Sequence, residues 1–321
     1  MKLLITGGTG FVGRHLVPTL LARGHEVHLL VRNPQKLDAI GVAGKVGVVK
    51  GDLFASAPFP AGLNGVLHLA ALTKAVRPAD LRRVNVDGTR ALLDRLTGQS
   101  SLQAFVCMSS LAAAGPSDPG RPHGEEDPSR PVSAYGRSKL EQERVVEAMP
   151  GPRAIVVRAP IVYGEGDLDM LDAMKIVHRG WLLLLGRTPR TYSAIYAGDL
   201  ATGLAALVEG NVAPGRYYLT HPEPFEWEPF MRLAAGIMGR KLRRLTVPLA
   251  AGWLAAAGAE GMRLLTGRAA IFSMDKFREM RHPAWVCSGE KMRLATGFVP
   301  PTPHRQALEA AISWYLRSGL L

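Results

Sequence analysis

The sequence predicts an α/β fold: a doubly wound parallel sheet with a smaller, mostly helical C-terminal region that caps it. The chain opens on a short apolar run, residues 2–5, which passes through a glycine-rich turn into a helical pattern. Short apolar runs then alternate with helical patterns as far as residue 157, which is typical of parallel strands joined by crossover helices. Beyond Gly164 the strand patterns become few.

These patterns also divide the chain. We expect a dinucleotide-binding domain over residues 1–165, to which a segment at about residues 191–215 returns. Residues 166–190 and 216–321 would form the substrate-capping region. Ligands of doubly wound sheets bind at the carboxyl ends of the strands, so we expect one crevice there. The residues at the predicted strand ends are Thr6, Arg32, Asp52, Ala70, Ser109, Ser110 and Arg158.

The turn after the first run reads TGGTGFVG, residues 6–13. Gly7 permits the tight turn, Gly10 lets the backbone approach a pyrophosphate, and Gly13 lets helix and strand pack closely. The diphosphate would lie on free N–H groups at the positive end of the following helix. We therefore expect cofactor contacts from Gly7, Thr9, Gly10, Phe11, Val12 and Gly13. The alternative is an ordinary strand-turn-helix corner.

The second predicted strand, residues 27–31, is followed by Arg32 and, after one turn, by Lys36. An acid at this point would bond the ribose 2′-hydroxyl of NAD, whereas an arginine accommodates the 2′-phosphate of NADP. Guanidinium recognises phosphate bidentately, so Arg32 favours NADP over NAD. The alternative is a solvated arginine at a strand end.

Later strand ends add further candidates. Asp52 follows a strand at residues 46–49 and is placed to bond an adenine amino group, or to cap a helix. Small residues end a strand at residues 66–71 and would pass beneath the cofactor, and Asn85 lies on a helix over residues 81–96. We expect cofactor contacts at these ends from Asp52, Leu53, Leu69, Ala70, Ala71 and Ala159.

Tyr135 and Lys139 are four residues apart at the start of a predicted helix, for which Ser133 is a candidate N-cap. On a helix both point along one face, so an ammonium would lower the pKa of the phenol and let it act as an acid or base. Ser110, at the end of the strand over residues 105–108, would hold a substrate oxygen. We expect Tyr135 and Lys139 to contact the cofactor as well.

Together these motifs resemble the extended short-chain dehydrogenases/reductases, the superfamily that includes nucleotide-sugar epimerases and dehydratases. The matching segments read TGGTGFVG, HLAA, NVDGT, SS, YGRSK, RAPIVYGEGD and YAGDLA, between residues 6 and 201. The resemblance implies a Rossmann domain and a catalytic set of Ser110, Tyr135 and Lys139, with Asn85 supporting a water relay. In the family the tyrosine transfers the proton, the lysine also bonds the nicotinamide ribose, and hydride moves to or from nicotinamide C4.

Departures from the family pattern narrow the activity. Ser110-Leu111-Ala112 stands where sugar dehydratases carry Thr-Asp-Glu, which argues against 4,6-dehydratase chemistry. The layout is similar to the 3β-hydroxysteroid dehydrogenase-like and dihydroflavonol-reductase-like branch. We therefore expect an NADP(H)-dependent oxidoreductase that interconverts a secondary alcohol and a ketone on a hydrophobic molecule. A nucleotide-sugar epimerase, with Arg187 and Arg190 on a diphosphate, is one alternative; a non-catalytic cofactor-binding or assembly protein is another.

The capping region adds a hint about surroundings. Residues 242–266 are apolar and small, but Glu260 and Arg263 interrupt them, so a clean membrane span is not available. They would form a buried cap helix, or an apolar mouth lying on an anionic membrane with the basic residues 240–244 at the headgroups. Both interpretations stay open.

Composition bounds the remaining classes. The formal net charge of +12 could indicate nucleic acid, an anionic membrane or anionic ligands, and Lys and Arg are concentrated between residues 240 and 293. Neither zinc-ligand spacing nor a series of base-stacking aromatics accompanies them, so we expect no nucleic acid and no metal. Cys107 and Cys287 make no disulfide framework, and from the pattern before the first strand we expect no secretion signal. We expect a cytoplasmic protein, with a peripheral membrane position left open, as a homodimer or monomer.

Overall fold

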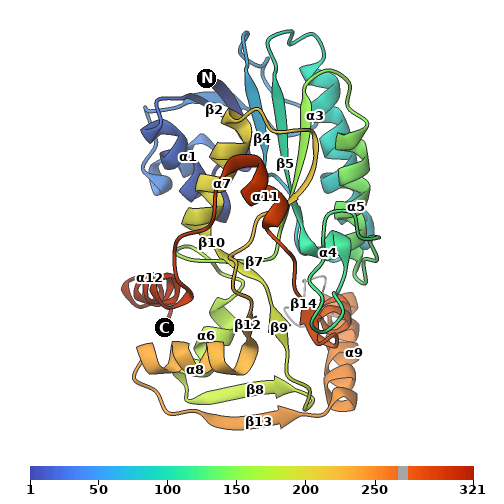
Figure 1. Ribbon diagram of the computed structural model, residues 1–321, viewed down its shortest axis with the longest axis vertical. Helices are drawn as coiled ribbons and strands as arrows, with labels where there is room; N and C mark the ends of the chain where they lie inside the picture. Colours follow the sequence, from blue (N-terminus) through green and yellow to red (C-terminus); the bar gives the residue numbers. More distant parts are fainter. Residues whose placement is uncertain (267–273) are drawn as a thin grey trace.

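The computed structural model describes residues 1–266 and 274–321, and we describe only the backbone of residues 262–266. A seven-stranded parallel sheet fills the upper part of the molecule, and the capping region lies beneath it (Figure 1). The strands are arranged in the order β11-β6-β5-β4-β1-β2-β3. Their bounds are β1 Lys2–Thr6, β2 Glu26–Val31, β3 Gly47–Lys50, β4 Gly65–His68, β5 Ala104–Ser110, β6 Arg153–Ala159 and β11 Gly215–Tyr218.

Helices cover both faces of this sheet (Figure 1). Successive side chains of a strand point to opposite faces, and β1 follows this rule. Leu3 and Ile5 pack in the core beneath α1 (Phe11–Ala22) and α7 (Ala197–Glu209), whereas Leu4 packs on the other side. That second face is covered by α3 Gly88–Leu96 and α5 Ala134–Glu147. The predicted doubly wound sheet is therefore confirmed.

The helix expected over residues 81–96 differs in detail. It begins earlier, as α2 (Pro78–Arg82), and continues through a π-helical turn, Arg83–Asp87, into α3. A π turn accommodates one extra residue and is frequent at functional sites. Here it contains the buried Asn85.

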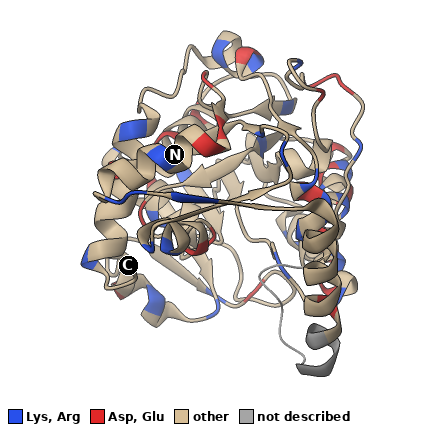
Figure 2. Ribbon diagram, turned by 90° about the horizontal axis from the view of Figure 1, so that it is seen from below, with Lys and Arg blue, Asp and Glu red and all other residues tan. Residues whose placement is uncertain are grey.

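The capping region has its own hydrophobic core. Met174, Phe230, Met231 and Ile312 are among the buried side chains that join its helices. Figure 2 looks at this region from below and shows β13 crossing the underside toward α9. Its elements are α6 Leu171–His178, β8 Trp181–Leu185, β9 Thr191–Tyr192, β12 Phe225–Glu226, α8 Trp227–Ile237, β13 Arg243–Val247, α9 Leu249–Thr266, α10 Met274–Met280, β14 Ala284–Trp285 and α12 His304–Arg317. Short connecting elements are η1 Pro34–Ile40, α4 Leu111–Ala114, β7 Ile161–Tyr163, β10 Ala194–Tyr196 and α11 Glu290–Thr296.

Two expectations about the last third of the chain were wrong. We expected the cap to begin again at residue 216, but residues 215–218 form β11, which pairs with β6 in the large sheet. We also expected few strands there, whereas β13 pairs with β8, and β12 and β14 pair with β9. The local pattern at residues 217–219 predicts a strand, in agreement with β11. These pairings join segments far apart in the sequence, so local periodicity does not reveal which strands pair.

The segment over residues 242–266 is likewise not one helix, since β13 precedes α9. Among the described residues, no helix is both long and apolar enough to pass through a bilayer. Arg268, which belongs to the basic segment, lies outside the described residues, and the side chain of Arg263 is not described.

Candidate active site

A cavity of about 2270 Å³ runs from the carboxyl edge of the sheet into the cap. The structure brings the predicted cofactor residues together along the upper end of the cavity. Ser110, Tyr135 and Lys139 of the predicted catalytic set line the cavity too. Asn85 does not line the cavity. The cofactor residues lining it are Gly7, Thr9, Gly10, Phe11, Val12, Gly13, Arg32, Asp52, Leu53, Leu69, Ala70, Ala71, Tyr135, Lys139 and Ala159.

The glycine turn is built for close backbone approach. Gly7 has φ +71°, and a Cβ there would lie 2.7 Å from the amide nitrogen of Ala70. A Cβ on Gly13 would lie 2.3 Å from the carbonyl oxygen of Gly8. Gly10 is the N-cap of α1, and no side chain caps this helix, so its first N–H groups face the cavity without a side-chain acceptor. This donor set suits a cofactor diphosphate.

The end of β2 presents two cations to the same cavity. Arg32 and Lys36 are exposed, both line the cavity, and neither forms an ion pair with a carboxylate of the described residues. Asp52, across from them, uses Oδ1 to accept the N–H groups of Phe54 and Ala55, each at 2.9 Å. These backbone bonds, with help from Arg32, lower the pKa of the Asp52 carboxyl. Asp52 therefore stabilises its own turn while lining the cavity.

Tyr135 and Ser110 line the same cavity, but the ammonium of Lys139 is bonded to groups other than the phenol. Oγ of Ser110 accepts the N–H of Ala112 at 3.2 Å. Nζ of Lys139 instead donates to the Met108 carbonyl at 2.6 Å and to Oε1 of Gln142 at 2.5 Å. Burial raises the pKa of Tyr135, against a smaller opposing effect of the Ser110 side chain. The prediction that Lys139 lowers this pKa is therefore wrong for the structure as described.

A buried chain of hydrogen bonds continues from Lys139 to the glycine turn. Nε2 of Gln142 donates to Oγ1 of Thr89 at 2.8 Å, and that hydroxyl donates to the Asn85 carbonyl at 2.6 Å. His68 lies 2.9 Å from Thr89 through Nε2 and 2.6 Å from Thr6 through Nδ1. The Thr89 hydroxyl has a single proton, which it donates in its hydrogen bond to the Asn85 carbonyl. Thr89 therefore accepts the bond from His68, and we assign the His68 proton to Nε2.

Nδ1 of His68 then accepts from the Thr6 hydroxyl, which in turn accepts the N–H of Ala70 at 3.2 Å. Burial, with a smaller contribution from Lys139, lowers the pKa of His68 to about 3, so its ring is neutral. Lys139 and the glycine turn after β1 are thus held by one continuous network.

Asn85 is engaged differently from the expected relay. Oδ1 accepts the N–H of Leu72 at 2.8 Å, and Nδ2 donates to the Leu72 carbonyl and to Oγ of Ser138. Its side chain thereby fastens the loop after β4 to α5. The π turn around Asn85 provides this geometry, which the sequence pattern did not show.

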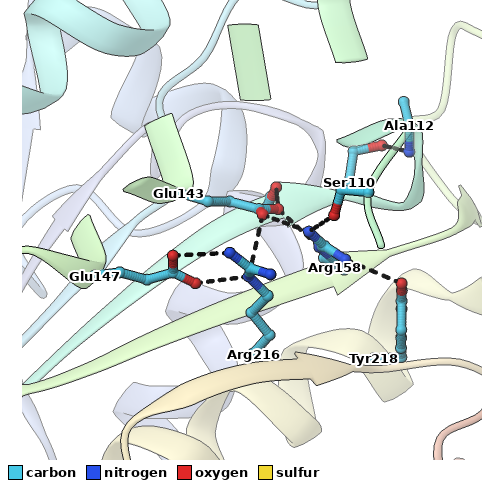
Figure 3. A network of polar contacts seen from close by, with 9 residues as sticks. Ser110, Ala112, Glu143, Glu147, Arg158, Arg216 and Tyr218 are labelled. Carbon is cyan, nitrogen blue, oxygen red and sulfur yellow. Dashed lines mark hydrogen bonds and ion pairs between the residues drawn. The ribbon is translucent and has the colours of Figure 1, made fainter. Parts of the chain in front are cut away.

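A second polar cluster lies behind Ser110 (Figure 3). Ser109 donates to Oε1 of Glu143 at 2.5 Å, and the Arg158 guanidinium binds both oxygens of that carboxylate at 2.9 and 2.7 Å. Glu143 and Arg158 are both fully buried. Arg158 also donates to the hydroxyls of Tyr218 and Ser129. The cluster ties the end of β5 to α5, β6 and β11, and so supports Ser110 from behind.

The lower end of the cavity is formed by residues that the motifs did not indicate. They come from β8, α8 and α9 and include Trp181, Leu183, Trp227, Met231 and Gly252. The apolar run at residues 181–185 is visible in the sequence, but its position against α9 depends on the tertiary structure. Near the sheet, burial raises the pKa of Asp167 to about 6, and Lys74 pairs with Asp169 at 2.6 Å across the cavity wall.

Comparison with known proteins agrees with this geometry. The family model described as NAD dependent epimerase/dehydratase family matches residues 3–219. The chain belongs to this family. It is an enzyme of the extended short-chain dehydrogenase/reductase group and uses a nicotinamide cofactor.

Named relatives include oxidoreductases. The chain is 32% identical over 327 residues to a ceramide reductase of Caulobacter vibrioides, covering 99% of this chain and 95% of that protein. It is 31% identical over 271 residues to a 3-beta-hydroxysteroid dehydrogenase of Mycolicibacterium neoaurum, covering 77% and 72%. The predicted resemblance to hydroxysteroid dehydrogenases is confirmed.

Solved structures show the same fold. The crystal structure of gox2253 has a TM-score of 0.80 at 23% identity and covers 100% of this chain and 99% of that one. MoeE5 in complex with UDP-glucuronic acid and NAD has a TM-score of 0.76 at 21% identity, covering 99% and 100%. RMD from Pseudomonas aeruginosa, complexed with NADPH, has a TM-score of 0.73 at 22% identity, covering 98% of both chains.

Proposed function

We propose that the enzyme is an NADP(H)-dependent oxidoreductase that interconverts a secondary alcohol and a ketone on a hydrophobic small molecule, acting as a monomer or homodimer. One observation carries this proposal. The cavity that holds Ser110, Tyr135 and Lys139 continues into an apolar lower end formed by the cap, including Trp181, Leu183 and Met231. Such a site suits a substrate with a reactive oxygen at one end and an apolar body.

We assign the proton transfer to Tyr135. Its hydroxyl, which lines the cavity together with Ser110, would give a proton to the developing alkoxide during reduction or take one during oxidation. Ser110 would also hold the substrate oxygen. Lys139 would bind the nicotinamide ribose. The nicotinamide cofactor supplies or accepts the hydride.

We assign NADP(H) as the cofactor because of Arg32 and Lys36. Both cations line the cavity at the end of β2 and lack a carboxylate partner among the described residues. A 2′-phosphate would supply the anion that they face. Since Asn85 is fully occupied by Leu72 and Ser138, we propose that it positions α5 rather than relaying protons.

Replacement of the phenol tests the function. With NADPH and a long-chain keto-ceramide or a 3-oxo steroid as probes, Tyr135→Phe should lower kcat by roughly a hundredfold or more. NADPH affinity should change by less than about twofold, because the aromatic ring remains. Tyr217→Phe is the matched control, since its hydroxyl bonds the Ala213 carbonyl away from the cavity.

Normal turnover by Tyr135→Phe would contradict the assignment of the proton donor. A screen of melting temperatures separates the substrate classes, because a ligand that binds only the folded state raises the melting temperature. Stabilisation by UDP- or GDP-sugars, with none by steroid or lipid ketones, would favour an epimerase instead.

A further inference from the structure

The outer side of the cap carries an unusual concentration of exposed apolar side chains. Six of the twelve large hydrophobic residues exposed in the described chain lie on β8, β13 and the first turns of α9. Trp253 and Leu254, on α9, are 51% and 64% exposed. The six residues are Trp181, Leu183, Leu245, Leu249, Trp253 and Leu254.

These residues form one continuous surface because the strands and the helix meet. Leu245 of β13 is the register partner of Leu183 of β8. At the far end of β8, a Cβ built on Gly186 would lie 3.5 Å from Cγ of Leu249, so the strand end contacts the start of α9. The side chain of Leu185 likewise packs against Gly252 of α9. Leu182, which points to the opposite face of β8, is buried in the cap core. The apolar surface is thus the outer face of the strand pair, extended by α9.

Positive charge gathers at the other end of the same strand pair. Arg240 and Lys241 precede β13, and Arg243 and Arg244 are its first two residues; all four are exposed. The guanidinium of Arg243 lies 5.9 Å from the centre of the Trp181 ring. Figure 2 shows these basic residues (blue) at the start of β13, which runs on toward α9. Of the four, only Arg244 approaches a carboxylate of the described residues, that of Glu228 at 3.8 Å.

We propose that this surface, β8, β13 and the start of α9, docks on an anionic phospholipid membrane. Exposed tryptophans and leucines insert at the level of the headgroups, and flanking lysines and arginines attract anionic lipids. The paired distribution of apolar and basic residues favours this occupant over a second copy of the chain, because an anionic membrane supplies negative charge opposite the basic residues.

The surface also adjoins the cavity. Trp181, Leu183 and Gly252 line the cavity as well, so its apolar end opens beside the docking surface. A hydrophobic substrate would therefore pass between lipid and active site without crossing water. This last step rests on the function proposed above, whereas membrane docking itself does not.

Sedimentation with vesicles tests the docking surface on the full-length chain. We expect the wild type to sediment with phosphatidylcholine/phosphatidylglycerol vesicles at low salt, and with phosphatidylcholine alone at least about tenfold less. Trp253→Ser with Leu254→Ser should weaken binding about tenfold or more, and Arg240→Glu with Arg243→Glu should do the same. Neither Trp253 nor Leu254 lines the cavity, and NADPH binding by each variant verifies folding.

Matched substitutions on the sheet domain provide the control. Leu294→Ser and Arg90→Glu change exposed residues of the same kinds far from the docking surface and should leave vesicle binding within about twofold. Absence of wild-type binding at low salt, or equal losses in the control variants, would overturn the proposal. The proposal would also fail if the Trp253→Ser, Leu254→Ser variant bound vesicles like the wild type but converted a dimer to a monomer, because the surface would then bind a second copy of the chain. Loss of turnover with intact vesicle binding would count against the proposed reaction alone.

Discussion

At the scale of single residues, the least expected feature is the set of partners that Lys139 has. Lys139 is fully buried, and burial lowers its pKa. Its ammonium is held by the carbonyl oxygens of Met108 and Gln142. An acceptor favours the charged form of a lysine, so Gln142 opposes the effect of burial. Gln142 is therefore a positioning residue for Lys139.

Substitution of Gln142 should change how activity depends on pH. In Gln142→Leu the ammonium loses an acceptor, so the pKa of Lys139 falls further and the charged form disappears at a lower pH. We expect kcat to fall about tenfold, with the basic limb of the kcat/KM profile displaced to lower pH. Gln142→Glu places a carboxylate beside the ammonium and should displace that limb to higher pH.

Glu141→Ala, on the exposed side of the same helix, is the control and should keep the wild-type profile. Identical pH profiles for the two Gln142 variants and the wild type would show that Gln142 does not act through Lys139.

At the scale of elements, α5 places four polar side chains in a row along the site. Its residues at four-residue spacing, Tyr135, Lys139, Glu143 and Glu147, follow one face of the helix. The first lines the cavity, the second joins the network to His68, and the third anchors Ser109 and Arg158. Glu147 pairs with Arg216 at the periphery. The buried ion pair between Glu143 and Arg158 thus holds α5 against the sheet, and with it the start of the helix that carries Tyr135.

Breaking the buried Glu143–Arg158 pair should lower the free energy of unfolding more than breaking the partly exposed Glu147–Arg216 pair. Glu143→Gln leaves the Arg158 guanidinium buried beside a neutral amide, so we expect a loss of about 3–5 kcal/mol in the free energy of unfolding. Glu147→Gln, at a half-exposed pair with Arg216, should lose less than about 1 kcal/mol. Urea denaturation measures both, and equal losses would refute the role of burial. The double variant Glu143→Leu, Arg158→Met should recover part of the loss.

At the scale of the whole molecule, the cofactor site is assembled from ends of many strands. Gly7 follows β1, Arg32 follows β2, Asp52 follows β3, and Tyr135 lies at the start of α5. A ligand held by all of them links parts of the sheet that are distant in sequence. Its binding should therefore stabilise the fold as a unit.

Thermal unfolding compares the two nicotinamide cofactors. NADPH at ~100 times its Kd should stabilise the wild type by about 2.7 kcal/mol, and NADH at the same concentration by less. Arg32→Asp should weaken NADPH binding about tenfold or more, because it replaces the phosphate-binding cation by an acid that suits the free ribose. Equal stabilisation by both cofactors in the wild type would contradict the assignment of NADP(H).

The sequence by itself determined the doubly wound sheet and the crevice at its strand ends. Alternation of apolar runs with helical patterns is a local property, and so is the glycine spacing around Gly7 and Gly13. The four-residue spacing of Tyr135 and Lys139 likewise predicted a shared helix face, and both residues line the cavity with Ser110.

Only the tertiary structure decided which neighbours these residues meet. Lys139 turns to Gln142 and Met108, Asn85 is committed to Leu72 through a π turn, and β8 pairs with β13 to form the outer face of the cap. Hydrogen bonds and strand pairs of this kind join residues distant along the chain. Because their formation depends on packing and burial, local periodicity and spacing do not encode them in a readable form.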